Sequence, residues 1–282
     1  MGKQNETATL DADRLARITV EPYPHEVSIS AHGVEIAHTT DALLFRGGYA
    51  PDIYVPAKDV RRELLMPSGT LDSPSKQARA DLFDARLAGQ TVEDIAWSYP
   101  APVRWPGIAG RIAFEFDKVR IEVDGQLVRG HVRDPLKTLT VAELGQRLTL
   151  ELGGQTVADT ARALVLRESG LPDRFYIPAG DVDRACLEPS DRRTVCTYKG
   201  EATYWHLKVA GQRFENAVWA YPEPWTDFAA DIGRIAGYLG FYASHFDRVL
   251  LDGQNIASAA DKAADSAMIA SPTIDSVMRE RA

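Results

Sequence analysis

The chain has 282 residues, of which 45% are hydrophobic and 26% charged, the composition of a globular protein with room for two domains. Its net charge of −8 disfavours binding to nucleic acid or to an anionic membrane surface, so we expect neither partner. No apolar run is long enough to cross a bilayer, and the N-terminal residues lack the apolar core of a signal peptide. We therefore expect a cytoplasmic protein.

The cysteine content limits the chemistry further. Cys186 and Cys196 are the two cysteines of the chain. Two cysteines exclude a disulfide framework and a zinc site built on four cysteines, and no histidine stands at a close ligand spacing to them. The sequence predicts a protein without a metal and without a cofactor.

In chain order, the sequence begins and ends with segments of a different character from its middle. Residues 1–16 are polar, which predicts a flexible arm. From Arg17 to residue 255, short β-branched and aromatic runs alternate with Gly, Pro and Asp turns, and one helical turn is predicted at 231–236. Residues 256–282 are Ala-rich and predict a short helix that frays into a mobile tail, in preference to a partner-binding peptide.

The middle of the chain contains an internal repeat. Pro56 matches Pro178, a shift of 122 residues (178 minus 56), and neighbouring blocks match at the same shift or one residue less. The matching blocks include Ile36-Ala37-x-Thr39 with Val157-Ala158-x-Thr160, Ala88-Gly89-Gln90 with Ala210-Gly211-Gln212, and Trp97-x-Tyr99-Pro100-x-Pro102 with Trp219-x-Tyr221-Pro222-x-Pro224. Two copies of this length predict two whole β domains, at 17–130 and 131–255.

Three ordered motifs mark the second copy. They are Arg174-Phe175-Tyr176-x-Pro178-x-x-Asp181-Val182, Thr194-x-Cys196-x-Tyr198-Lys199-Gly200-x-Ala202-x-Tyr204, and Ala217-x-Trp219-x-Tyr221-Pro222-x-Pro224. Over about residues 146–253 they resemble the bacterial family catalogued as domain of unknown function 427, which some catalogues label a nucleotidyltransferase domain. Thr197 stands where that family usually has proline.

The resemblance implies a compact β fold of the tent type, similar to the Mss4-like fold. It implies little about activity. The residues themselves include neither a Gly-rich phosphate loop of the Walker type nor a paired-aspartate metal motif, so they do not support the nucleotidyltransferase label.

The second motif contains the most reactive side chains of the chain. Lys199 follows Cys196 by three positions, in a turn that ends at Gly200. A nearby ammonium stabilises a thiolate, so the two residues are candidate catalytic groups. Lys199 is alternatively a Schiff-base lysine or an anion holder. The competing interpretation is a small buried Cys196 and a solvated Lys199.

The first motif places a cation before a predicted strand. Arg174 is suited to a bidentate grip on carboxylate or phosphate, with Tyr176 beside it as a candidate binding residue. An equally good interpretation is a structural bridge between Arg174 and Asp181.

The third motif belongs to a predicted hairpin with a three-residue loop at 210–212. Tyr204, Trp219 and Tyr221 are candidate walls of a ligand pocket, although tryptophan and tyrosine at such positions more often belong to a core. His206 is a candidate binding residue or general base, against the commoner interpretation of a surface histidine.

The first copy has lost most of the reactive residues and kept the aromatic-proline block. At the shift of 122, its residues are Pro74, Gln77, Leu82 and Phe83 where the second copy has Cys196, Lys199, Tyr204 and Trp205. The retained block is therefore expected to serve the fold, and the lost block to serve something else, although neutral drift explains the loss almost as well.

Three functions fit these patterns. We favour an enzyme acting on a small anionic or polar metabolite, with Cys196 as nucleophile or acid–base group, Lys199 as its charge partner and Arg174 as anion clamp. The alternatives are a binding module that uses the same pocket without chemistry, and a structural or interaction protein built from two repeats. The substrate, the reaction and the oligomeric state do not follow from the sequence.

Overall fold

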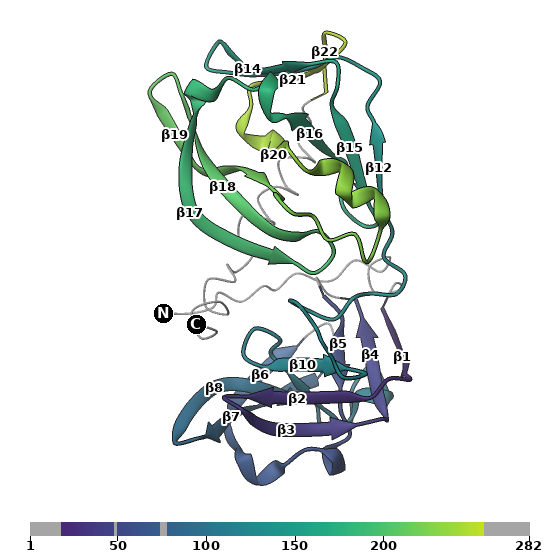
Figure 1. Ribbon diagram of the computed structural model, residues 1–282. Coiled ribbons are helices and arrows are strands. Elements are labelled where there is room, and N and C mark those ends of the chain that lie inside the picture. Colours follow the sequence, from purple (N-terminus) through teal and green to yellow (C-terminus); the bar gives the residue numbers. More distant parts are fainter. Residues whose placement is uncertain (1–17, 48–49, 74–77, 257–282) are drawn as a thin grey trace. The chain divides into compact units, whose positions relative to one another are not determined.

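The computed structural model describes residues 18–47, 50–73 and 78–256. The chain divides into two compact units, Met1–Asp134 and Pro135–Ala282, and the predicted fold class is confirmed because antiparallel strands dominate both (Figure 1). The predicted domain limits and the likeness to the Mss4-like tent stay predictions. The predicted arm and, apart from Ile256, the predicted tail lie outside the described residues. No described helix is long and apolar enough to cross a membrane.

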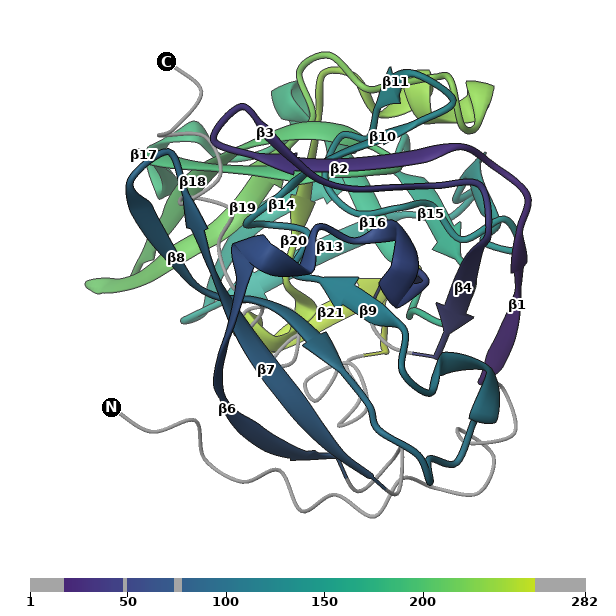
Figure 2. The ribbon, with the colours of Figure 1, turned by 90° about the horizontal axis from the view of Figure 1, so that it is seen from below.

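The first unit contains strands β1 to β11, which form three sheets (Figure 2). Their orders are β1-β4-β5, β11-β10-β2-β3 and β6-β7-β8-β9. Two reciprocal backbone bonds, Val55 N to Ile112 O at 2.8 Å and Ile112 N to Val55 O at 2.9 Å, join the β5 end of the first sheet to β9. The bounds are β1 Thr19–Tyr23, β2 Val27–Ala31, β3 Val34–Thr39, β4 Ala42–Arg46, β5 Asp52–Tyr54, β6 Leu65–Ser73, β7 Ala78–Leu87, β8 Gln90–Ser98, β9 Ile112–Phe114, β10 Arg120–Val123 and β11 Gln126–Leu127, with 3₁₀ helices η1 Ala57–Asp59, η2 Arg62–Leu64 and η4 Pro106–Ile108.

The second unit repeats this order with strands β12 to β22. Its main sheet has seven strands in the order β12-β15-β16-β20-β19-β18-β17, and a second sheet has the order β14-β13-β21-β22. The bounds are β12 Leu139–Glu143, β13 Leu148–Leu152, β14 Gln155–Thr160, β15 Leu164–Glu168, β16 Arg174–Pro178, β17 Leu187–Cys196, β18 Gly200–Val209, β19 Gln212–Ala220, β20 Tyr238–Phe241, β21 Arg248–Leu251 and β22 Gln254–Asn255, with 3₁₀ helices η5 Ala179–Asp181, η6 Arg184–Cys186, η7 Ala230–Ile235 and η8 Ala243–His245.

The hairpin between β18 and β19 turns more tightly than the sequence predicts. Val209 pairs with Gln212, so the loop has two residues, Ala210 and Gly211, and the predicted three-residue loop at 210–212 is wrong. Both residues have positive φ, +50° and +78°, the conformation of the two-residue turns that match strand twist. The pairing register of β18 and β19 therefore sets the loop length.

The seven-stranded sheet buries apolar side chains on both faces, because successive residues of a strand point to opposite sides. One face packs against the sheet of β13, β14 and β21 and forms the larger core of the unit. The other face is partly covered by η7, where Arg234 Nη1 donates to Val141 O at 2.9 Å. We call this second side the Tyr176 face, and its buried apolar residues are Leu139, Val141, Leu164, Leu166, Tyr176, Tyr198, Ala202, Tyr204, Trp219, Tyr221, Ile232, Ile235 and Tyr242.

The first unit has a smaller counterpart of the Tyr176 face. It contains Phe45, Tyr54, Ala80, Tyr99, Val103, Ile108 and Ala113, with η4 in the position of η7 along the chain. The two units thus build the same two-core arrangement from the same strand order, and the differences between these two faces isolate what is particular to the second unit.

Candidate functional site

A tryptophan–tyrosine hydrogen bond frames the Tyr176 face. Trp219 Nε1 donates to Tyr176 OH at 3.2 Å, across the Gly240 position of the intervening strand β20. A Cβ at Gly240 would lie 2.5 Å from Trp219 Cε2, so the indole rests directly on the glycine backbone. The first unit has the same bond, from Trp97 Nε1 to Tyr54 OH at 3.2 Å. This pair therefore belongs to the shared fold.

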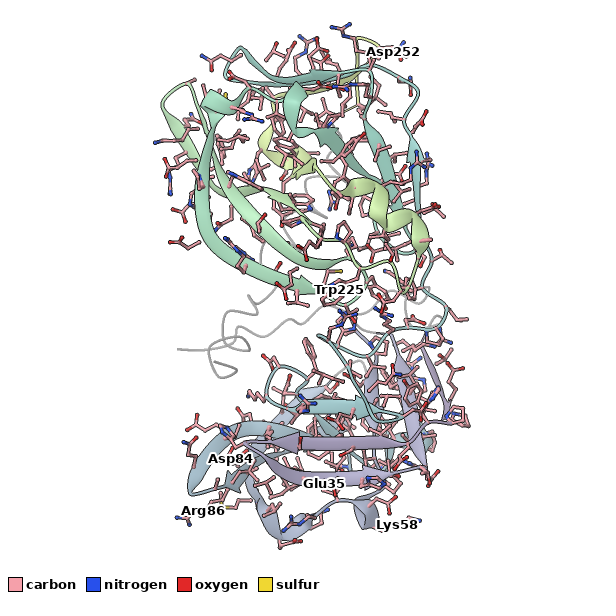
Figure 3. All side chains as sticks on the ribbon, in the orientation of Figure 1. Glu35, Lys58, Asp84, Arg86, Trp225 and Asp252 are labelled. Atoms are coloured by element: carbon pink, nitrogen blue, oxygen red, sulfur yellow. The ribbon has the colours of Figure 1, made fainter. Side chains whose placement is uncertain are left out.

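The turn from β17 to β18 presents Lys199 to the Tyr176 face. Cys196 pairs with Gly200, and Lys199 N donates to Cys196 O at 3.2 Å across the turn. Gly200 has φ +110°, where an L side chain is strained, and a Cβ there would meet Glu223 O and the Trp225 ring. Trp225 N donates to Lys199 O at 3.0 Å and lies beside the end of this hairpin (Figure 3). The backbone of the turn is fixed on both sides.

Lys199 belongs to a buried charge cluster. Its Nζ donates to Glu168 Oε2 at 2.5 Å, and Lys137 Nζ lies 3.0 Å from the other oxygen, Oε1. Lys199 and Glu168 are each only 9% exposed. Lys137 also donates to Ser169 O at 2.8 Å and lies 6.0 Å above the Tyr198 ring. One carboxylate thus bridges two ammonium groups.

The charges of this cluster stabilise one another. Burial opposes the charge of Glu168, but Lys199 and then Lys137 outweigh it and hold the pKa of that carboxyl below its usual range. Burial likewise opposes the Lys199 ammonium, yet Cys196, Glu168 and Tyr176 together hold its pKa above its usual range. Lys199 is therefore an ammonium at neutral pH. A Schiff-base lysine needs a neutral amine, so the geometry favours the charge-partner and anion-holding roles over the Schiff base.

Cys196 lies at the edge of the same face. It is a free, half-buried cysteine packed against the aromatic cluster, and its interaction with Lys199 is the largest factor that raises the pKa of Lys199 against burial. Cys186 is different, because it belongs to the core on the other face of the sheet, where its Sγ lies 3.5 Å from Asp183 Oδ2. Burial, followed by the effects of Asp183, raises the pKa of the Cys186 thiol.

The tyrosines of the face are neutral hydroxyls. Burial raises the pKa of Tyr176 to about 12 and that of Tyr221 well above its ordinary value. Burial also raises the pKa of Tyr204, whose hydroxyl lies 2.8 Å from Thr194 Oγ1. The Arg192 guanidinium lies 5.1 Å above the Tyr204 ring. Tyr176, Tyr204, Tyr221 and Trp219 are all buried here, as side chains of a packed cluster, and a ligand pocket between them stays a prediction.

Arg174 shares the Tyr176 face. It is 8% exposed. Tyr176 follows it by two residues in β16, so strand alternation places both side chains on the same side of the sheet. The alternative interpretation was a structural bridge between Arg174 and Asp181. The Asp181 carboxylate instead accepts hydrogen bonds from Arg162 Nη2 and from Thr160 Oγ1, each at 2.6 Å. The anion-clamp role of Arg174 stays a prediction.

His206 has a structural partner. Its Nδ1 accepts the backbone N–H of Asn216 at 3.1 Å, and Asn216 has φ +52° in the bulge between β18 and β19. In the first unit Asp84 accepts the N–H of Asp94, which has φ +47°, at 2.8 Å (Figure 3 labels Asp84). Different side chains therefore accept the hydrogen bond of the bulge backbone N–H in the two repeats. His206 is not among the residues of the Tyr176 face.

In the part of the chain that the structure describes, the buried charges are confined to one unit. Among the described residues, the buried Asp, Glu, Lys and Arg side chains are Glu168, Arg174 and Lys199. By strand register, Asp52 replaces Arg174 in the first unit, and by sequence alignment Gly47 replaces Glu168 and Gln77 replaces Lys199. The aromatic frame is kept in both units while these charges are changed together.

Glu168 and Lys137 were not indicated by the sequence patterns. Glu168 and Lys199 are 31 positions apart in the chain, and only the sheet order brings them together. A signal existed for Glu168, because Arg167 aligns with Arg46 and the next position changes from Glu168 to Gly47. No group of three or more His, Cys, Asp or Glu in the described part of the chain is arranged to hold a metal ion.

The fold and this face define a tandem pair of small antiparallel β domains, and among the described residues the second alone buries a charge cluster. The chain belongs to the family described as domain of unknown function DUF427, whose profile matches residues 19–125 and again 140–252. The two matches coincide with the two repeats, so both copies are members. A comparison with curated proteins finds no match to this chain.

Proposed function

We propose that the second repeat is a small-molecule enzyme domain whose chemistry is centred on Cys196 and Lys199, and that the first repeat is a copy that has kept the fold without that site. The observation that carries this proposal is the confinement of the buried charges Glu168, Arg174 and Lys199 to the second repeat. Burying ions costs several kcal/mol each unless they are paired. A fold that the first repeat builds without them does not need them.

The roles follow from the positions. Lys199, kept as an ammonium by Glu168, is the charge partner of Cys196 at the edge of the face, because a nearby ammonium stabilises a thiolate. Cys196 then supplies the nucleophile or acid–base group. The aromatic side chains and Arg174 hold a small polar or anionic metabolite. A binding module without chemistry uses the same residues, and it differs in not requiring a reactive Cys196.

The test compares two cysteines in one chain. Iodoacetamide labelling at pH 7.5, read by peptide mass spectrometry, is expected to modify Cys196 roughly tenfold or more faster than Cys186, because the thiolate is the reactive form. Lys199→Met is expected to slow Cys196 labelling, and Lys199→Arg to restore it in part. Lys208→Met is the matched control, since Lys208 lies on the same strand but is exposed and pairs with Glu188. Equal labelling of both cysteines, or indifference of Cys196 to Lys199→Met, would remove the enzyme proposal.

A further inference from the structure

A partly open row of side chains lies along β17, the edge strand of the seven-stranded sheet. Thr194 and Cys196 are two positions apart in β17, so both side chains lie on the same side of the sheet, with Cα atoms about 7 Å apart. Tyr204 belongs to this side too, because its hydroxyl lies 2.8 Å from Thr194 Oγ1 and its ring is part of the Tyr176 face. Thr194 and Cys196 are each half-buried, so solvent reaches part of the row.

Arg192 completes this row. Its guanidinium lies 5.1 Å above the Tyr204 ring, so its charge is on the same side of the sheet as Cys196. Its Nε is buried and has no hydrogen-bond partner, and no carboxylate in the described part of the chain forms an ion pair with it. Buried donors normally have acceptors. An arginine held against an aromatic ring with an unused N–H donor is therefore suited to bind an anion.

A β-bulge gives Arg192 this position. The register of β17 on β18 shifts between Ser190 and Arg193, and Arg192 lies in the bulged segment. Ser190 Oγ accepts the backbone N–H of Arg192 at 3.1 Å and donates to Asn216 Oδ1 at 2.5 Å, which anchors the bulge to β19. A bulge redirects a side chain that would otherwise follow strand alternation. The direction of Arg192 is thus fixed by the backbone.

The first repeat has a shorter bulge at this place. Two residues lie between Pro67 and Thr70, whereas three lie between Pro189 and Arg193, and the partners of these four residues on the neighbouring strands are equivalent in the two repeats. The second repeat therefore has one residue more in the bulge that presents Arg192.

The hydroxyl pair is also particular to the second repeat. By strand register, Leu71 takes the place of Thr194, and Leu82 takes the place of Tyr204. Leu71 is 52% exposed, so the first repeat leaves an apolar side chain open at this position. The first repeat also contains no cysteine. The cation and both hydroxyls thus accompany Cys196, and the fold is built without them in the other copy.

We propose that Arg192 is the specificity-determining residue of the Cys196 site and that it selects a substrate with a carboxylate group, which its guanidinium binds beside the hydroxyls of Thr194 and Tyr204. This inference rests on the proposed function and names the residue that recognises the substrate. A guanidinium presents its N–H donors in a planar fork that matches the two oxygens of a carboxylate. One cation flanked by neutral hydroxyls also matches the single negative charge of that group.

Two alkylating reagents test this on the full chain. Iodoacetate and iodoacetamide both alkylate a thiolate with loss of iodide, and of the two only iodoacetate carries a carboxylate. The ratio of their rates at Cys196, read by peptide mass spectrometry, therefore measures the preference for a carboxylate and does not depend on how much thiolate is present. Arg192→Met removes the charge, and Arg192→Lys keeps it without the planar fork. Arg193→Met is the matched control, because Arg193 is exposed and its Nη1 donates to the backbone carbonyls of Ser190 and Arg192.

Arg192→Met is expected to lower the ratio of iodoacetate to iodoacetamide rates by about fivefold, the effect of one partly screened charge near the thiol. Arg192→Lys should recover only part of the ratio, and Arg193→Met should keep all of it. An unchanged ratio in Arg192→Met, full recovery in Arg192→Lys, or an equal fall in Arg193→Met would overturn the inference.

The same measurement keeps the two proposals apart, because the ratio can be read on a slowly reacting thiol as well. A Cys196 that labels no faster than Cys186 but has an Arg192-dependent ratio contradicts the enzyme alone. A fast Cys196 whose ratio does not depend on Arg192 contradicts this inference alone.

Discussion

The Lys199 ammonium donates to Glu168 Oε2 at 2.5 Å inside the second repeat, and the first repeat has glutamine and glycine at the two aligned positions. Both partners are nine-tenths buried. A pair of this kind contributes little to stability when compared with apolar residues of the same size, but it is costly to break from one side. Its presence in one repeat only is the basis of the predictions on charge and reactivity.

Breaking the pair from one side should destabilise the second repeat. Glu168→Gln leaves two ammonium groups without their carboxylate and is expected to lower the free energy of unfolding by about 3 to 5 kcal/mol. Lys199→Met leaves the buried carboxylate paired with Lys137 alone, so its cost should be smaller. The double variant should cost clearly less than the two losses added together, because its members interact directly. Urea unfolding of the four proteins measures this. Additive losses would mean that the two side chains are not coupled.

The pair should also determine part of the acid sensitivity. The pKa of Glu168 is lowered in the folded state, so its stabilising contribution is complete above the unfolded value of about 4.3 and is lost as the pH falls through the lower folded value. The pKa of Lys199 is raised, so its contribution is complete below about 10.4 and is lost above the higher folded value. The stability difference between wild type and Glu168→Gln should therefore be flat between about pH 5 and 10 and shrink below about pH 4. A difference that persists unchanged down to pH 3 would contradict the assignment.

The two bulge caps should behave alike. His206→Ala and Asp84→Ala each remove the acceptor of a backbone N–H at a residue with positive φ. Each is expected to cost about 1 kcal/mol of stability. Because His206 serves the bulge, His206→Ala should leave Cys196 labelling at the wild-type rate. If His206→Ala sharply slowed Cys196 labelling while stability was unchanged, His206 would have to belong to the candidate site.

Gly240 should be sensitive to a single methyl group. Its Cβ would lie 2.5 Å from Trp219, and that indole is also held by Tyr242 at a ring-centroid distance of 4.6 Å. Gly240→Ala is therefore expected to cost about 1 to 3 kcal/mol by overpacking and to alter the tryptophan fluorescence. The first repeat tolerates Ala113 opposite Trp97, whose indole is only half-buried. An unchanged melting temperature and spectrum would show that the indole moves aside freely.

The sequence was sufficient for the parts of the fold that depend on local patterns. The repeat, the strand-rich class and the turn at Gly200 follow from matched motifs, alternation and turn residues, and the structure shows each of them. The loop at 210–212 was predicted one residue too long, because loop length depends on the register of two long strands rather than on the Ala-Gly-Gln sequence alone. Register is a property of the pair of strands, and one strand does not determine it.

The partners of the candidate residues were harder to predict. The sequence indicated Cys196 as the partner of Lys199, three positions away. The hydrogen bond goes instead to Glu168, from a strand that is not adjacent to β18, and both groups are buried. A bridge from Arg174 to Asp181 was predicted as an equally good alternative to the anion clamp, but the Asp181 carboxylate is bonded to Arg162 and Thr160. The pairing of these side chains depends on which strands lie close together in the folded sheet, and the sequence motifs do not determine that.

The central claim is that the second repeat alone carries a ligand site built on Lys199. The most direct measurement is mass spectrometry of small molecules that co-purify with wild type, with Lys199→Gln and with Tyr99→Phe, each first shown to be folded by its near-ultraviolet circular dichroism. Lys199→Gln gives position 199 the residue found at Gln77 in the first repeat. We predict that an anionic small molecule is enriched on wild type and on Tyr99→Phe and is lost from Lys199→Gln. A small molecule retained equally by all three proteins would contradict the claim.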